Sequence, residues 1–286
     1  MTITKGVRTM ATDSFTHISS ASNPRIKDLV KLRDRSHRDA AGLILVEGYR
    51  ELLRAVDSGV AVKELYFCEK FFLGENEGDL IRRATEKGAS VFTVAEAPFR
   101  KISYRDRPDG LIATVTPRVT TLASLRISKN PLLVVCQAIE KPGNLGAILR
   151  SADAAGADAV IVCDGVTDIN NPNVVRASTG TLFTVPVIET TTQEVIDWLK
   201  KKGIMIVAAT PHASTCYTGV DFTRPCAIAV GAEQYGLNKD LLEQADTTVR
   251  IPMAGVADSL NVATATTLLL FEAGRQRGFG SKTAQR

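Results

Sequence analysis

Apolar and polar residues alternate in blocks along most of this chain, and the blocks predict strands that alternate with helices. Between residues 43 and 115, strand-like runs such as 62–67 are separated by helical patterns, two of which end at glycines. A second series begins at Leu132, where apolar runs such as 132–136 and 159–163 again alternate with helices. Continuously apolar runs are typical of strands that are buried on both faces. The second series therefore predicts a mainly parallel sheet.

These patterns predict an α/β chain with two domains. Residues 1–20 have no apolar core of the kind found in a signal peptide, and we expect them to form a disordered leader. Residues 21–116 are predicted to form a small N-terminal substrate-binding domain, and residues 132–277 a larger C-terminal domain. The stretch 117–131, with a proline at each end and no clear period, is predicted to be a linker. Residues 278–286 are expected to be a frayed tail.

Composition narrows the class of protein. Hydrophobic residues make up 44% of the chain, and its longest apolar runs are too short to cross a bilayer, so we expect no membrane span. The five cysteines form no C-x-x-C pair, and three of them lie in strand-like runs, which predicts a cytoplasmic protein without structural zinc. The three histidines are far apart in the sequence, which gives little support to a metal site or a Ser-His-Asp triad.

A basic segment near the start is a candidate surface for RNA. It opens with Asn23-Pro24, a helix-start signature, and the net charge of the whole chain is +4. The cations could be an ordinary solvated helix face or could contact phosphates, and the sequence leaves both readings open. The candidate RNA-binding residues in this segment are Arg25, Lys27, Lys31, Arg33 and Arg38.

Three stretches of the second half combine glycines with polar side chains after predicted strands. They read Ala138-Ile-Glu-Lys-Pro-Gly-Asn-Leu-Gly-Ala-Ile-Leu-Arg150, in which Asn144 lies at a predicted helix start, Gly231-Ala-Glu-Gln-Tyr-Gly-Leu237, and Ile251-Pro-Met followed by Ser259-Leu-Asn261. Ligands of parallel sheets usually bind at the carboxyl ends of the strands, so we expect the three loops to converge there. By itself the third loop also fits a capped strand-to-helix turn. The chain contains no G-x-G-x-x-G fingerprint, no phosphate loop and no G-x-S-x-G elbow.

Together, in this order and spacing, the three motifs closely resemble those of the SpoU, or TrmH-type, RNA ribose 2′-O-methyltransferases of the SPOUT class. The resemblance covers residues 132–277, and the preceding domain is similar to a small α/β RNA-binding domain that resembles certain ribosomal proteins. The resemblance implies a parallel sheet with a deep trefoil knot. It also implies S-adenosylmethionine as the methyl donor, with S-adenosylhomocysteine as the product, and a homodimer formed through the C-terminal domain.

The resemblance also assigns candidate residues. The stretch around Arg176 is similar to an arginine-bearing stretch of related rRNA enzymes, although Arg176 could equally be a helix-surface cation. The implied catalytic residues are Asn144, Arg150, Glu233, Ser259 and Asn261. The implied cofactor-binding residues are Thr210, Gly231, Ile251, Met253 and Leu260.

The expected function is therefore methyl transfer from S-adenosylmethionine to a ribose 2′-hydroxyl of RNA. The basic front domain favours 23S rRNA as the substrate, and RNA is the expected partner. Two alternatives stay open: the same activity on tRNA, and a catalytically silent RNA-binding or ribosome-assembly factor on the same fold. We expect neither a metal nor a membrane partner.

Overall fold

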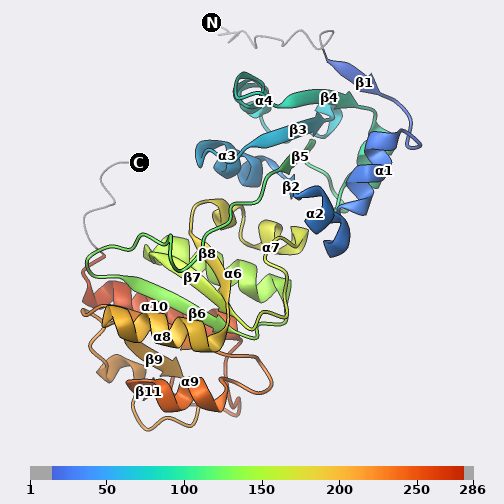
Figure 1. Cartoon of the computed structure of the whole chain (residues 1–286). Coiled ribbons are helices and arrows are strands. Elements are labelled where there is room, and N and C mark those ends of the chain that lie inside the picture. Colours follow the sequence, from blue (N-terminus) through green and yellow to red (C-terminus); the bar gives the residue numbers. More distant parts are fainter. Residues whose placement is uncertain (1–14, 280–286) are drawn as a thin grey trace, which may run out of the picture. The chain divides into compact units, whose positions relative to one another are not determined.

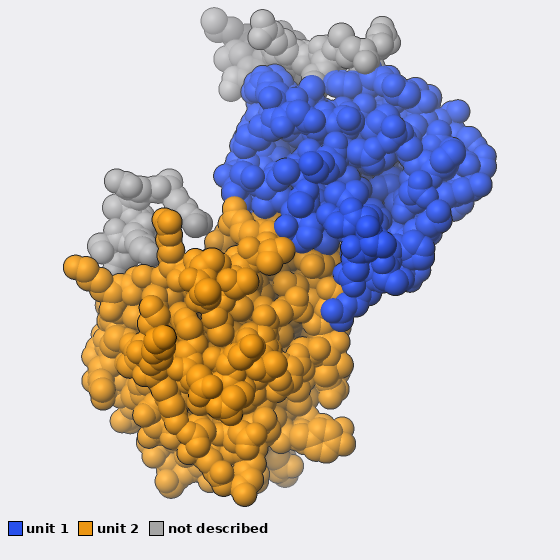
Figure 2. Space-filling model, in the orientation of Figure 1, with its two compact units in different colours: residues 1–117 blue, residues 118–286 orange. Residues whose placement is uncertain are grey.

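The structure is a computed structural model that describes residues 15 to 279 of the chain. It divides the chain into two compact units, Met1–Pro117 and Arg118–Arg286, which Figure 2 shows in blue and orange. Each unit has its own sheet and is described by itself below. Among residues 15 to 279, no helix is both long enough and apolar enough to cross a membrane.

The first unit contains a five-stranded sheet in the order β1-β4-β3-β5-β2. The first three of these strands run parallel, and β5 runs antiparallel to both β3 and β2. The bounds are β1 Thr16–Ile18, β2 Ile44–Glu47, β3 Val62–Phe67, β4 Ser90–Val94 and β5 Leu111–Val115.

Helices cover both faces of this sheet (Figure 1). On one face, Ile26 and Phe99 belong to the core cluster that α1 and α5 form with Tyr66 and Phe92. Helices α3 and α4 pack against each other and against the sheet strands. The bounds are α1 Pro24–Lys31, α2 Arg35–Ala41, α3 Tyr49–Asp57, α4 Glu77–Glu86 and α5 Glu96–Ile102.

The predicted disordered leader is wrong for residues 16 to 20. Thr16–Ile18 form β1, which pairs with β4 through His17 and Thr93, and Ile18 is 2% exposed. Three residues are too few to show an alternating pattern, and the strand exists because the edge of β4 supplies its hydrogen-bond partners. Residues 1–14 lie outside the described residues.

The second unit is built on a six-stranded sheet in the order β11-β9-β10-β6-β7-β8. All of its strand pairs are parallel, which confirms the predicted parallel sheet. The bounds are β6 Leu132–Gln137, β7 Ala159–Cys163, β8 Val187–Thr190, β9 Met205–Ala209, β10 Cys226–Val230 and β11 Thr247–Val249.

Two helical layers bury this sheet, which explains its continuously apolar strands. Leu145 of α6 and Leu269 of α10 belong to the core on one face, whereas Val195 of α8 and Leu241 of α9 belong to the core on the other. Helices α6 and α7 also pack against each other. The bounds are α6 Pro142–Ala155, α7 Pro172–Ala177, α8 Thr192–Lys202, α9 Lys239–Gln244 and α10 Val262–Gln276.

Two segments of the second unit lie between its regular elements. Thr181–Phe183 form a 3-10 turn after α7, so that β8 begins only at Val187. The stretch expected as a linker also carries Leu122, Leu125 and Ile127, which pack against the α8 and α9 side of the core. Residues 280–286 of the expected tail lie outside the described residues.

Gly146 allows α6 to approach α7 closely. A Cβ at this position would lie 2.5 Å from the Cβ of Ala177 and 2.8 Å from the backbone nitrogen of Ser178. We expect Gly146→Ala to lower the free energy of unfolding by about 1–3 kcal/mol, as overpacked cores do, in a denaturant titration. Gly143→Ala in the same helix is the matched control, because its Cβ would meet no atom within 4 Å. Equal unfolding midpoints for the two variants would contradict the role of Gly146 in packing.

Candidate functional site

The site lies where the strand order reverses. After β6, the chain continues to β7 and β8 on one side, while β10 and β9 lie on the other side of β6. Crevices for ligands in parallel sheets form outside the carboxyl ends of the strands at such a switch point. Val230 at the end of β10 pairs with Cys136 of β6, so the loops that follow these two strands begin side by side.

The loop after β10 is a tight turn that depends on its glycines. Gly231 is buried, and a Cβ there would lie 2.1 Å from the carbonyl oxygen of Gly236. Gly236 adopts a φ of +67° and donates its backbone N–H to the carbonyl of Ala232 at 2.9 Å. This fold-back leaves Glu233 exposed at the tip of the turn, beside the loop after β6.

One residue from each of the three motifs meets at this edge of the sheet. Glu233 accepts hydrogen bonds from the side chains of Lys141 and Asn144. The Asn261 carboxamide donates to Asn144 Oδ1 at 3.1 Å and to Glu233 Oε1 at 3.3 Å. We call Lys141, Asn144, Glu233 and Asn261 the motif cluster.

The Asn261 side chain also caps a helix. Its Oδ1 accepts from the backbone N–H of Ala263 at 3.0 Å and of Thr264 at 3.4 Å, and so caps α10. The sequence left a cap and a site residue as alternatives for this loop. Asn261 does both, because its oxygen serves the helix while its nitrogen joins the motif cluster.

Charge pairing sets the electrostatics of the cluster. The hydrogen bond from the Lys141 ammonium is the largest cause that lowers the pKa of Glu233 below its usual value. The same contact raises the pKa of Lys141. Glu233 is therefore held as a carboxylate that accepts from three side chains at once, which orients the Asn144 amide.

Arg150 and Ser259 lie outside the motif cluster. Arg150 follows Gly146 by one helical turn, on the side of α6 that faces α7, and is exposed. Asn144 bonds to Glu233 and Asn261 and not to Arg150. Neither Arg150 nor Ser259 has a hydrogen-bond or ion-pair partner among residues 15 to 279, so both side chains are available to a ligand.

The candidate cofactor residues follow the ends of β9, β10 and β11. The backbone N–H of Thr210 donates to the Val249 carbonyl at 2.9 Å, and Arg250 is tied to Thr215 in the same way. Beyond Arg250, Ile251 and Met253 are half-buried. The candidate residues in this part of the site are Thr210, Gly231, Ile251, Met253 and Leu260.

These side chains fit the methyl donor that the motifs imply. Leu260 is 37% exposed, and Ile251 packs only partly against the core. Half-exposed apolar side chains beside loop backbone suit a nucleoside with a sulfonium-bearing chain, because its base requires apolar contact and backbone polar groups. Within the described part of the chain, no group of three or more His, Cys, Asp or Glu residues is arranged to hold a metal ion.

The basic candidates of the first unit divide into exposed and structural residues. Lys27 and Lys31 are exposed. Arg25 is exposed too, with its guanidinium 4.4 Å from the centre of the Phe92 ring and paired with Glu64. Arg176 of the second unit is exposed and has no ion-pair partner among the described residues.

Two of the basic candidates point inward. The expectation that Arg38 contacts RNA is wrong, because its side chain is 3% exposed and donates to the carbonyls of Leu32 and Arg33 after α1. Arg33 is half-buried and donates to the carbonyls of Lys101 and Ser103 at 2.8 and 2.9 Å. A guanidinium has enough N–H donors to bond to several carbonyls, and both arginines use their donors in this way.

Sequence reasoning missed two residues of this region. Lys141, the counter-ion of Glu233, precedes the first motif, and its only sequence signal is a cation between a strand end and Pro142. Gln137 is 3% exposed and accepts from the backbone N–H of Asn238 at 2.8 Å while donating to Thr192 at 2.6 Å. The available sequence signal was a polar residue at the end of a buried strand. Gln137 connects the end of β6 to the starts of α8 and α9.

Comparison with known families agrees with this geometry. The SpoU rRNA Methylase family matches residues 131–271, and the MRM3-like substrate binding domain matches residues 23–113. A 23S rRNA (uridine(2479)-2′-O)-methyltransferase of Streptomyces viridochromogenes is 33% identical over 252 residues, which are 86% of this chain and 87% of that protein. The chain belongs to the SpoU rRNA methylase family. The resemblance inferred from the three motifs is thus confirmed.

Other members of the family show how far the likeness extends. The 23S rRNA (guanosine(2553)-2′-O)-methyltransferase RlmP of Bacillus subtilis is 30% identical, over 89% of this chain and 97% of its own length. The crystal structure of an rRNA methyltransferase from Sinorhizobium meliloti with bound AdoMet superposes with a TM-score of 0.84 at 32% identity, and covers 91% of this chain and 98% of that one. The predicted SPOUT fold with a front α/β domain is confirmed, while the trefoil knot within it stays a prediction.

The dependence of Glu233 on Lys141 can be measured directly. Lys141→Met should raise the pKa of Glu233 toward its usual value of 4.5, since the Lys141 hydrogen bond is the largest cause of the lowering. Carboxyl NMR titration measures this, with Lys239→Met as the control because Lys239 pairs with Glu243.

The sign of the pH dependence follows from the lowered pKa. The cluster stabilises the folded chain above the unfolded pKa of Glu233, and this contribution is lost as the pH falls through the folded value. An unchanged titration of Glu233 in Lys141→Met would contradict the assigned pairing.

Proposed function

We propose that this chain transfers the methyl group of S-adenosylmethionine to a ribose 2′-hydroxyl of 23S rRNA. The observation that carries the proposal is the motif cluster, in which Asn144, Glu233 and Asn261 meet at the switch point of the sheet. The two relatives described above act on 23S rRNA, one at a uridine and one at a guanosine, and support this RNA as the substrate class. They leave the target nucleotide open.

The chemistry requires an aligned hydroxyl and removal of its proton. S-adenosylmethionine supplies a methyl group on a positively charged sulfur, which is a good leaving group. The chain must hold the ribose oxygen in line with that methyl group and stabilise the negative charge that develops on the oxygen. A guanidinium stays protonated, so Arg150 is assigned to hold the target phosphate and stabilise the oxyanion, and the proton passes to phosphate or water.

The motif cluster has a positioning role in this proposal. Glu233 holds the Asn144 amide, and Asn261 links both to the rigid start of α10. Ser259, two residues before Asn261 and exposed, is assigned to contact the substrate or donor. Thr210, Gly231, Ile251, Met253 and Leu260 are assigned to the methyl donor.

The first unit and Arg176 supply the RNA surface in this proposal. Lys27, Lys31, Arg25 and Arg176 are exposed and can contact phosphates, which would make binding weaken with salt. All five cysteines are free, which agrees with a reducing cytoplasm. We therefore propose a cytoplasmic enzyme.

A homodimer through the second unit is part of the same proposal. Leu268 and Phe271 of α10 are 37% and 43% exposed, and Phe279 beyond the helix is 49% exposed. The Phe271 and Phe279 rings lie 5.5 Å apart. Exposed aromatic and aliphatic side chains gathered in this way are typical of the centre of a protein interface.

Arg150→Ala tests the activity. We expect transfer of labelled methyl groups to 23S rRNA to fall by about 100-fold or more, the loss typical when a group that stabilises an oxyanion is removed. Calorimetric binding of S-adenosylmethionine should be unchanged, and stability should change by no more than about 0.5 kcal/mol because Arg150 is exposed. Arg126→Ala, another exposed arginine of the second unit outside the three motifs, is the matched control.

The same assays separate the open alternatives. Methyl transfer to tRNA and not to 23S rRNA would identify tRNA as the substrate in place of 23S rRNA. RNA binding without binding of the methyl donor would favour the silent RNA-binding factor. Normal transfer by Arg150→Ala would remove Arg150 from the site.

Phe271→Glu tests the dimer. A carboxylate in an apolar interface is desolvated without a partner, so we expect sedimentation velocity to show a dimer for the unchanged chain and a monomer for the variant. Leu73→Glu is the control, because Leu73 is 81% exposed and lies in the first unit. A monomeric unchanged chain would contradict the proposal.

A further inference from the structure

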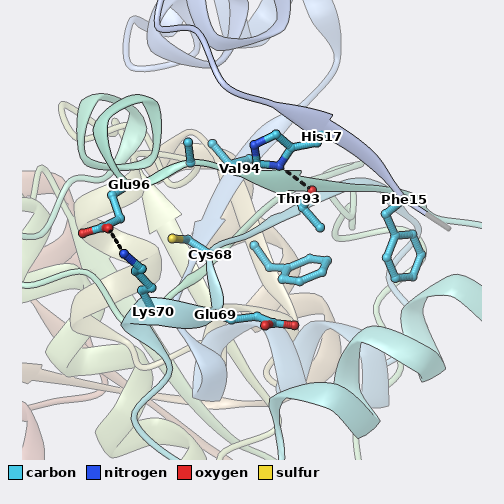
Figure 3. A pocket seen from close by; sticks show the side chains of 10 residues that line it. Phe15, His17, Cys68, Glu69, Lys70, Thr93, Val94 and Glu96 are labelled. Carbon is cyan, nitrogen blue, oxygen red and sulfur yellow. Dashed lines mark hydrogen bonds and ion pairs between the residues drawn. The ribbon is translucent and has the colours of Figure 1, made fainter. Parts of the chain in front are cut away.

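A hollow opens at the carboxyl ends of β1, β3 and β4 in the first unit (Figure 3). Its volume is about 620 Å³, within the range of small-molecule sites in proteins. Phe15, directly before β1, and His17 of β1 form one side of it, in a segment that the sequence did not predict as a strand and that lies outside the residues matched as a substrate-binding domain. The side chains that matter below are Phe15, His17, Phe67, Lys70, Thr93 and Glu96.

Strand register points three of these side chains into the same hollow. His17 pairs with Thr93 across β1 and β4, and Thr93 pairs with Phe67 across β4 and β3, so the three side chains lie on the same face. The Phe67 ring is 2% exposed and forms a fixed floor. The Phe15 ring stands edge-on to it, with ring centroids 5.8 Å apart and planes at 89°. The two rings form an aromatic corner that suits a flat apolar group.

Polar groups stand around this aromatic corner. The Nδ1 of His17 bonds to the hydroxyl of Thr93 at 2.9 Å, which orients the imidazole and leaves Nε2 without a partner in the described chain. On the opposite side, Lys70 donates to Glu96 at 2.6 Å, and Figure 3 shows Cys68 between this ion pair and the aromatic side. A planar group entering the hollow would therefore meet hydrogen-bond donors and acceptors at its edges.

The charges argue for a base and against a phosphate. Glu69 and Glu96 both line the hollow, whereas Lys70 is its only lysine or arginine among the described residues. Carboxylates repel phosphate but accept hydrogen bonds from the amino and imino groups of nucleobases. Proteins that read single-stranded RNA stack splayed bases on aromatic rings and bond to the edges of those bases.

We propose that this hollow binds an unpaired nucleobase of the substrate RNA, stacked on the Phe15 ring above the Phe67 floor and held at its edges by His17 and by Lys70 and Glu96. The inference rests on the proposed function, because it takes RNA as the substrate. It assigns recognition of an extruded base to the first unit, in addition to the phosphate contacts of the basic segment. β1 thereby acquires a role as one wall of a base-binding site.

The test uses the full-length chain and an in vitro transcript of 23S rRNA. Phe15→Ala should weaken RNA binding about tenfold or more, the size of one lost base stack, and His17→Ala should weaken it about tenfold through the loss of one hydrogen bond. The slope of log K against log salt should not change, because no phosphate contact is lost. Leu73→Ala is the matched control, since Leu73 is 81% exposed in the same unit and does not line the hollow.

A second measurement does not depend on any variant being folded. Irradiation of the unchanged chain with a 4-thiouridine-substituted transcript should crosslink an unpaired nucleotide to the peptide that contains Phe15 and His17, or to the one that contains Phe67 to Lys70. A fully double-stranded RNA of the same length should give neither crosslink. Crosslinks confined to other peptides, or a salt slope that falls in Phe15→Ala, would overturn the proposal.

Failure of this inference can be told from failure of the proposed function. If the unchanged chain methylates the transcript while Phe15→Ala and His17→Ala bind RNA as tightly as Leu73→Ala, only the base site is overturned. If the unchanged chain binds no RNA, both are overturned. Capture of an extended peptide by the hollow, with no RNA crosslink, would assign the hollow to a protein partner.

Discussion

Parallel pairing of β6 with β10 is the contact on which the candidate site depends. The two strands lie far apart in the sequence, yet Val230 pairs with Cys136 and brings the loops after the two strands together. Because every strand pair of this sheet is parallel, the loop after β11 opens at the same edge. At this edge the side chains of Lys141 and Asn261 bond to Glu233, although no local sequence pattern brings the three residues together.

Three residues of the cluster lie where a helix starts or a turn closes. Asn261 caps α10 and Asn144 lies in the first turn of α6. The turn that carries Glu233 closes only because Gly231 lacks a Cβ. Displacing the Asn261 side chain would also remove the cap of α10, which couples the cluster to the start of that helix.

The first unit shows how a basic sequence can mislead. Arg33 and Arg38 are cations of the same basic segment as Lys27 and Lys31, but their guanidinium groups bond to carbonyls at the ends of α1 and α5. A single ammonium with three donors on a flexible stem serves this purpose less well. The lysines are therefore left at the surface, where phosphates can reach them.

The sequence by itself determined the elements and the identity of the three motifs. The strand Ala159–Cys163 begins and ends where its apolar run does, because burial on both faces leaves a local signal. Asn144, Glu233 and Asn261 belong to these motifs, and the sequence alone predicts them as site residues. Only the tertiary structure paired Glu233 with Lys141, turned Arg38 inward and added β1 to the edge of β4. Each of these depends on partners distant in the sequence, and no local pattern records which distant backbone or charge a residue will meet.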